Sequence, residues 1–83
     1  MAKKILVVDD SALMRRVLCD IIDSDERFQV TARATNGLDA LELLSRNQYD
    51  AVVLDVNMPR MNGLELLEEL QKRKIPVRVM MAS

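Results

Sequence analysis

Residues 51–59 read Ala-Val-Val-Leu-Asp-Val-Asn-Met-Pro, and the rest of the chain can be interpreted from them. The apolar run ends abruptly in Asp55, and Pro59 follows four residues later. A short continuous apolar run is typical of a strand that is buried on both faces of a parallel sheet. We therefore predict a strand over 51–54 that brings one carboxylate to its C-terminal end.

A second apolar run repeats this pattern near the N-terminus. Residues 4–8 read Lys-Ile-Leu-Val-Val and are followed by Asp9 and Asp10. Residues 28–34 instead alternate between apolar and polar side chains, which is typical of a half-exposed strand at a sheet edge. Residues 77–82 supply a fourth strand. Two buried strands that both end in acid are the main chemical signal in this sequence.

Amphipathic helices are predicted in the three intervals between these strands. The first begins after Ser11, a good N-cap residue, and ends around residues 23–25. The second follows the turn at residues 35–37, and its apolar pattern ends after residue 44, where polar residues begin. Asn62 caps the third, with Glu65 placed for a capping box, and Pro76 stops it. The chain thus alternates strand and helix from end to end.

This alternation predicts an α/β fold, a doubly wound parallel sheet with right-handed crossovers, forming one domain over residues 1–83. An edge position for the second strand and interior positions for the first and third give the strand order 2-1-3-4. Ligands of such sheets bind beyond the C-terminal strand ends, where the winding direction reverses. Asp9, Asp10 and Asp55 should meet there. Mg²⁺ would neutralise their repulsion, leaving one acid free to act as a nucleophile.

The composition excludes several function classes. Twelve basic and thirteen acidic residues give a net charge of −1, so no basic field attracts nucleic acid or an anionic membrane. No apolar run is long enough to cross a bilayer or to form a signal-peptide core, so we expect a cytoplasmic protein. One cysteine, Cys19, and no histidine exclude an internal disulfide, a Cys/His zinc site and a Ser-His-Asp triad.

Several motifs together resemble the receiver domain of bacterial two-component response regulators. They are Val7-Val8-Asp9-Asp10-Ser11, Leu54-Asp55-Val56-Asn57-Met58-Pro59, Asn62-Gly63 and the strand that ends in Ser83. The resemblance runs from Lys3 to Ser83 and implies a flavodoxin-like fold. Residues 10–16 and 58–63 look most similar to chemotaxis regulators, in particular to the receiver half of the chemotaxis protein-glutamate methylesterase.

The resemblance implies a role for each matching residue. Asp55 corresponds to the aspartate that accepts a phosphoryl group from the phosphohistidine of a sensor histidine kinase. Asp10 corresponds to the direct Mg²⁺ ligand, and Asp9 to the acid that holds the metal mainly through water. Asn57 corresponds to the residue whose backbone carbonyl completes the metal site. Ser83 corresponds to the hydroxyl that contacts the phosphoryl group.

The sequence departs from the receiver pattern after Ser83. A complete receiver continues with a helix, a strand ending in lysine, and a last helix, so the sequence is interpreted as C-terminally truncated. The lysines at positions 3, 4, 72 and 74 are not placed to replace that lysine. The fourth strand should form an open edge, which a homodimer or a domain-completing partner could cover. The hydrolase domain of a methylesterase is absent, so no esterase activity is expected.

Three functions compete. The first is a phospho-accepting signalling module that uses Mg²⁺ and acts in a chemotaxis-type pathway. The second is a receiver fragment that serves only as a structural or self-associating module without phosphotransfer. The third is a phosphohydrolase with an aspartyl nucleophile, which would want a second acid two residues after Asp55, where this chain has Asn57.

Overall fold

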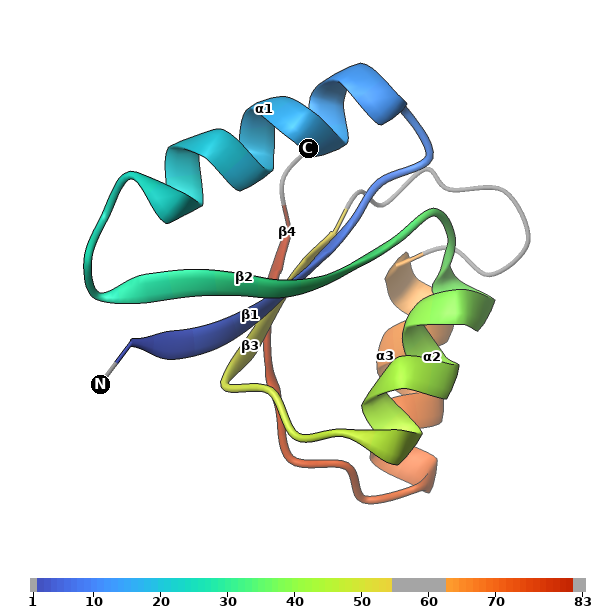
Figure 1. Ribbon diagram of the computed structural model, residues 1–83. Helices are drawn as coiled ribbons and strands as arrows, with labels where there is room; N and C mark the ends of the chain where they lie inside the picture. The colour runs from blue at the N-terminus through green and yellow to red at the C-terminus, as the bar shows by residue number, and fades with distance from the viewer. Residues whose placement is uncertain (1, 55–62, 82–83) are drawn as a thin grey trace.

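The seven predicted elements are all present in the structure, a computed structural model that describes residues 2–54 and 63–81. Helices and strands alternate along the chain (Figure 1). They are β1 (Lys3–Val8), α1 (Ala12–Asp23), β2 (Phe28–Ala34), α2 (Gly37–Arg46), β3 (Ala51–Leu54), α3 (Gly63–Lys72) and β4 (Arg78–Met81). No helix in the described ranges is both long and apolar enough to cross a bilayer.

The sheet is parallel and has the order β2-β1-β3-β4, which confirms the prediction. Figure 1 shows α1 on one face of the sheet and α2 and α3 together on the other. The strands in the middle owe their places to their apolar runs. Residues 5–8 of β1 are all buried, whereas β2 alternates between buried and exposed side chains, as a strand at the edge should.

The core consists of two apolar clusters, one on each face of the sheet. Leu6, Val8 and Leu54 pack with α2 and α3, and Leu66 and Leu70 of α3 belong to the same cluster. The second cluster includes Ile5, Val7 and Cys19 and lies on the α1 face. Successive strand residues point to opposite faces, so β1 supplies side chains to both clusters.

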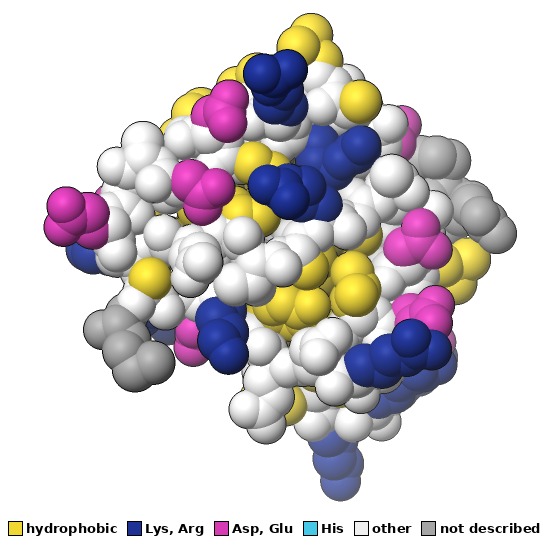
Figure 2. Space-filling model, viewed as in Figure 1, with side chains coloured by type: hydrophobic (Ala, Val, Ile, Leu, Met, Phe, Trp, Pro, Cys, Tyr) yellow, Lys and Arg dark blue, Asp and Glu magenta, His cyan; other side chains and the backbone are white. Residues whose placement is uncertain are grey.

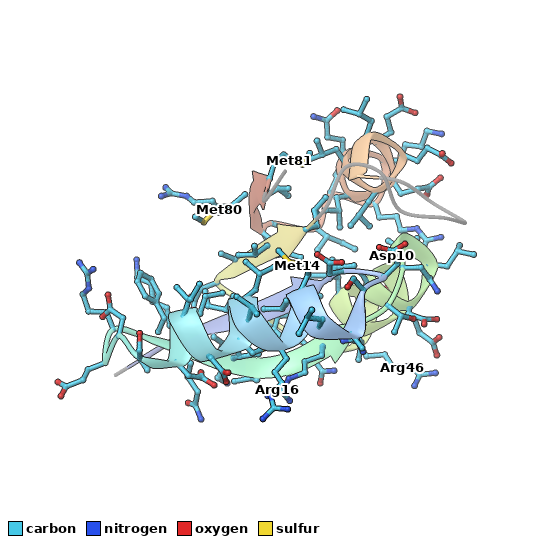
Figure 3. The ribbon with its side chains drawn as sticks, turned by 90° about the horizontal axis from the view of Figure 1, so that it is seen from above. Asp10, Met14, Arg16, Arg46, Met80 and Met81 are labelled. Carbon is cyan, nitrogen blue, oxygen red and sulfur yellow. The ribbon has the colours of Figure 1, made fainter. Side chains whose placement is uncertain are left out.

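The apolar face predicted for α1 is only partly buried. Cys19 is 3% exposed, but Leu13 is 72% and Ile21 is 62% exposed. Figure 3 shows Met14 on the side of α1 toward β4, where Met80 and Met81 also lie. Met80 is 52% exposed. Within the described residues α1 is the one helix on this face, and apolar side chains reach the surface over it (Figure 2).

A bulge in β2 sets the register of the site-bearing end of the sheet. Ile5 pairs with Val30 but Leu6 pairs with Ala32, so Thr31 is the extra residue. The freed backbone N–H of Val30 donates to Asp23 Oδ1 at 2.8 Å. Because of this shift Val8 pairs with Ala34, the last residue of β2.

The end of α3 differs from the prediction. Pro76 was expected to stop the helix, but the helix ends at Lys72, and Lys74 adopts a left-handed φ of 54°. Ile75 N–H donates to Leu70 O at 3.0 Å, and Lys74 N–H donates to Gln71 O at 3.2 Å. These two bonds form a Schellman motif, which ends the helix before the proline is reached.

Candidate functional site

All four strands end at the same edge of the sheet. Val8 is the register partner of Ala34 on one side and of Leu54 on the other, and Leu54 pairs in turn with Met81. Asp9 follows Val8 in the sequence, and Asp55 follows Leu54. The structure therefore confirms that the two buried strands, each followed by an acidic residue in the sequence, end side by side at Val8 and Leu54. Asp55, Asn57 and Ser83 lie outside the described residues.

Asp9 is a buried carboxylate, with 4% of its surface exposed. Its backbone N–H donates to Ala34 O at 3.1 Å, which continues the β1–β2 ladder by one residue. Its Oδ1 accepts a hydrogen bond of 2.9 Å from the backbone N–H of Ser11. The carboxylate is thus fixed in orientation by the chain segment that leads into α1.

Asp10 is exposed, in contrast to Asp9. Figure 3 shows Asp10 at the end of α1 where the helix begins. Ser11 is the N-cap, as predicted, and its hydroxyl accepts a hydrogen bond of 3.3 Å from Met14 N–H. The positive end of the α1 dipole lies beside these two acids.

Arg15 contacts this loop, which sequence reasoning missed. A polar residue of an amphipathic helix is expected to face solvent, but Arg15 Nη1 donates to the backbone carbonyl of Asp9 at 2.8 Å. The available signal was its position, four residues after the Ser11 N-cap, because long helical side chains run back toward the helix N-terminus. Arg16 is exposed, as expected.

The loop after β2 lies at the same edge of the sheet and is held internally. Asn36 is 7% exposed and caps α2, since its Oδ1 accepts a hydrogen bond of 2.9 Å from Asp39 N–H. Its Nδ2 donates to Thr35 Oγ1 at 3.4 Å and to Asp39 Oδ2 at 3.3 Å. These bonds order the loop beside Asp9, and they confirm the helix-capping turn predicted at residues 35–37.

The donors at this edge fit a hard divalent cation. Asp9 and Asp10 offer carboxylate oxygens, which Mg²⁺ prefers and commonly takes one or two at a time. Within residues 2–54 and 63–81, no group of three or more acidic or cysteine side chains is placed to hold a metal ion. A three-acid site therefore requires Asp55, which the sequence places directly after Leu54.

The sequence model of the response regulator receiver domain matches residues 5–83. Two curated proteins named protein-glutamate methylesterase/protein-glutamine glutaminase are similar to this chain. The one from Pyrococcus horikoshii is 52% identical over 80 residues, which cover 96% of this chain and 22% of the relative. The one from Thermotoga maritima is 46% identical, with 96% and 23% covered. The chain therefore spans about a fifth of the length of these curated relatives.

Solved structures of response regulators are also similar to this chain. The response regulator domain of Thermotoga maritima CheB superimposes with a TM-score of 0.90 and 44% identity, covering 98% of this chain and 60% of that one. A chain of the CheX–CheY–BeF₃–Mg²⁺ complex from Borrelia burgdorferi gives a TM-score of 0.86 and 31% identity, covering 95% and 60%.

Proposed function

Because the chain belongs to the family of response regulator receiver domains, we propose that it is a phospho-accepting module of a two-component, chemotaxis-type pathway. A sensor histidine kinase supplies the phosphoryl group from a phosphohistidine. The phosphorus–nitrogen bond of the donor breaks as a bond forms between phosphorus and an Asp55 carboxylate oxygen, giving an acyl phosphate. The observation that carries this proposal is the pairing of Val8 with Leu54, because each directly precedes a proposed site acid.

The residues around Asp55 are proposed to hold Mg²⁺. Asp10 is the direct ligand, Asp9 acts mainly through water, and Asp55 and the Asn57 carbonyl complete the set. The exposure of Asp10 and the burial of Asp9 support this division, since the exposed acid can reach an ion at the mouth of the site. When bound, Mg²⁺ neutralises charge on the phosphoryl oxygens. The Ser83 hydroxyl is proposed to contact the phosphoryl group.

The chain is proposed to be regulatory and to have no esterase activity of its own. The named relatives are methylesterases, but the chain spans only about a fifth of their length. The family match over residues 5–83 is to the receiver domain. The proposed place of action is the cytoplasm.

A structural or self-associating role is the second candidate. The exposed side chains of Leu13, Ile21 and Met80 are the observation behind it, because burial of such apolar area stabilises an interface, whereas the family match favours the first candidate. A homodimer or a domain-completing partner would bury these apolar side chains. Sedimentation, combined with a measurement of phosphoryl uptake, distinguishes the candidates. A monomer that takes up phosphoryl supports the first, and a dimer that takes up none supports the second.

The experiment that tests the proposed function uses beryllofluoride as a phosphoryl mimic in the presence of Mg²⁺. The wild-type chain should form an adduct that fluorine NMR detects, and Asp55→Asn should form none. Asp20→Asn is the matched control, because Asp20 is an exposed acid on α1. An adduct that persists in Asp55→Asn, or its absence from the wild type, would count against the proposal.

A further inference from the structure

Arg15 places a positive charge near the positive end of the α1 dipole. It is the fourth residue of the helix, and its backbone N–H donates to Ser11 O at 2.9 Å. Its guanidinium turns back past the helix N-terminus and reaches Asp9 O at 2.8 Å. A cation near the positive end of a helix dipole is unfavourable unless another interaction offsets the repulsion.

An ion pair does not provide that compensation within the described part of the chain. No described carboxylate lies within 4.0 Å of the Arg15 guanidinium, and the first turn of α1 holds no acidic residue. The described partner of the guanidinium is a main-chain carbonyl. A planar, charged donor fixes the orientation of the peptide plane to which it binds. The contact therefore orients the peptide that follows Asp9 and does not neutralise a charge in the described residues.

Asp9 is held at three atoms by three different parts of the structure. Its N–H is bonded to Ala34 of β2, its Oδ1 to the backbone of Ser11, and its carbonyl oxygen to Arg15 of α1. The carbonyl belongs to the peptide that links Asp9 to Asp10, so Arg15 acts on both acids. We infer that Arg15 is a positioning residue, which orders the Asp9–Asp10 peptide in the metal-free chain and so favours Mg²⁺ binding. This inference rests on the proposed Mg²⁺ site.

Positioning and simple electrostatics predict opposite effects when the charge is removed. If Arg15 acted only as a positive charge, its loss would strengthen Mg²⁺ binding, because two cations repel one another. If it orders the loop, its loss would weaken Mg²⁺ binding, because the entropy of ordering the loop would then oppose binding. The direction of the change in affinity separates the two roles.

The test compares Arg15→Met with Arg16→Met in the full chain. Arg16 is its exposed neighbour, and Figure 3 shows it pointing away from Met80 and Met81. Calorimetric titration with Mg²⁺ should show affinity that is lower by roughly three- to tenfold in Arg15→Met, given the strength of a partly exposed charged hydrogen bond. Arg16→Met should match the wild type. Unchanged or tighter binding in Arg15→Met would overturn the inference.

A second readout needs no metal. Solvent-exchange NMR on the metal-free chain follows the Ser11 N–H, which donates to Asp9 Oδ1. Arg15→Met should speed its exchange several-fold, while the amides of Val7 and Val52 in the core keep their wild-type rates. Equal acceleration of the core amides would mean global destabilisation, and no acceleration at Ser11 would contradict positioning. If the wild type binds no Mg²⁺, the proposed function fails, but this arm still tests what Arg15 orders.

Discussion

Val8 and Leu54 are register partners in the parallel pair of β1 and β3, and an aspartate follows each of them in the sequence. Both side chains are fully buried, so the pairing is part of the core and does not depend on the loops beyond it. Adjacent strands lie about 4.8 Å apart. The register therefore supports a shared site for Asp9, Asp10 and Asp55 at the edge where these strands end.

Neutralising Asp9 should stabilise the metal-free chain. Asp9→Asn keeps an oxygen that can accept from Ser11 N–H but removes one charge from the proposed acid cluster. Relief of like-charge repulsion should raise the free energy of unfolding by about 1 kcal/mol without Mg²⁺, and the stabilisation that Mg²⁺ gives should decrease. Urea denaturation with Mg²⁺ or with a chelator measures both effects. Lower stability of Asp9→Asn in chelator would contradict the repulsion argument.

Replacing Lys74 with glycine should also stabilise the chain. Lys74 has a φ of 54°, where a side chain is strained and glycine is not. Lys74→Gly should raise the free energy of unfolding by about 1 kcal/mol. Gln71→Gly is the control within α3, and it should lower stability by about the same amount, because glycine is unfavourable inside a helix. The left-handed conformation would be in error if both variants were destabilised in urea titrations.

Substitutions of Leu66 and Leu64 should show how much α3 contributes to the stability of the core. Leu66 is fully buried, while Leu64 is 59% exposed on the same helix. Leu66→Ala should lower the free energy of unfolding by about 2–5 kcal/mol, because burial is lost and a cavity is left. Leu64→Ala should stay within about 0.5 kcal/mol of wild type. Similar losses in the two variants would show that α3 is rotated from the orientation described above.

Asp25 should titrate at unusually low pH. Hydrogen bonds from the Arg27 side chain, and then from its backbone N–H, lower the pKa of Asp25 from 3.8 to about 2. Because the pKa is depressed on folding, the stabilisation is complete above pH 4 and disappears as the pH falls toward 2. Carboxyl NMR should give a midpoint near 2, which moves toward 3.8 in Arg27→Gln. The same midpoint in both proteins would show that the pair is not formed in solution.

Much of the fold was predictable because the strand patterns differ from one another. The apolar runs at 5–8 and 51–54 identify interior strands, and the alternation at 28–34 identifies an edge. The bulge at Thr31 was not predictable, since it depends on Asp23 taking up the Val30 N–H from another element. The exposure of Leu13 was missed because periodicity shows which helix face is apolar but not what packs against it.

The candidate site was predicted in part. The sequence places Asp9 and Asp10 correctly at the end of β1, and it also identifies the Ser11 cap. It does not distinguish the buried Asp9 from the exposed Asp10, because burial depends on tertiary packing, which the order of residues at the strand end does not reveal. The spacing of Arg15 from the Ser11 cap indicates that its side chain runs back toward the helix N-terminus, but it does not identify Asp9 O as the acceptor, because that depends on how the helix follows the strand.

Asp55 is proposed to accept a phosphoryl group at an Mg²⁺ site formed with Asp9 and Asp10. Intact-mass spectrometry after incubation with Mg²⁺ and a small acyl phosphate tests this claim most directly. The wild type should gain one hydroxylamine-labile phosphoryl group, Asp55→Asn should gain none, and a chelator should prevent the gain. A phosphoryl group that survives hydroxylamine, or one that still forms in Asp55→Asn, would contradict the proposal.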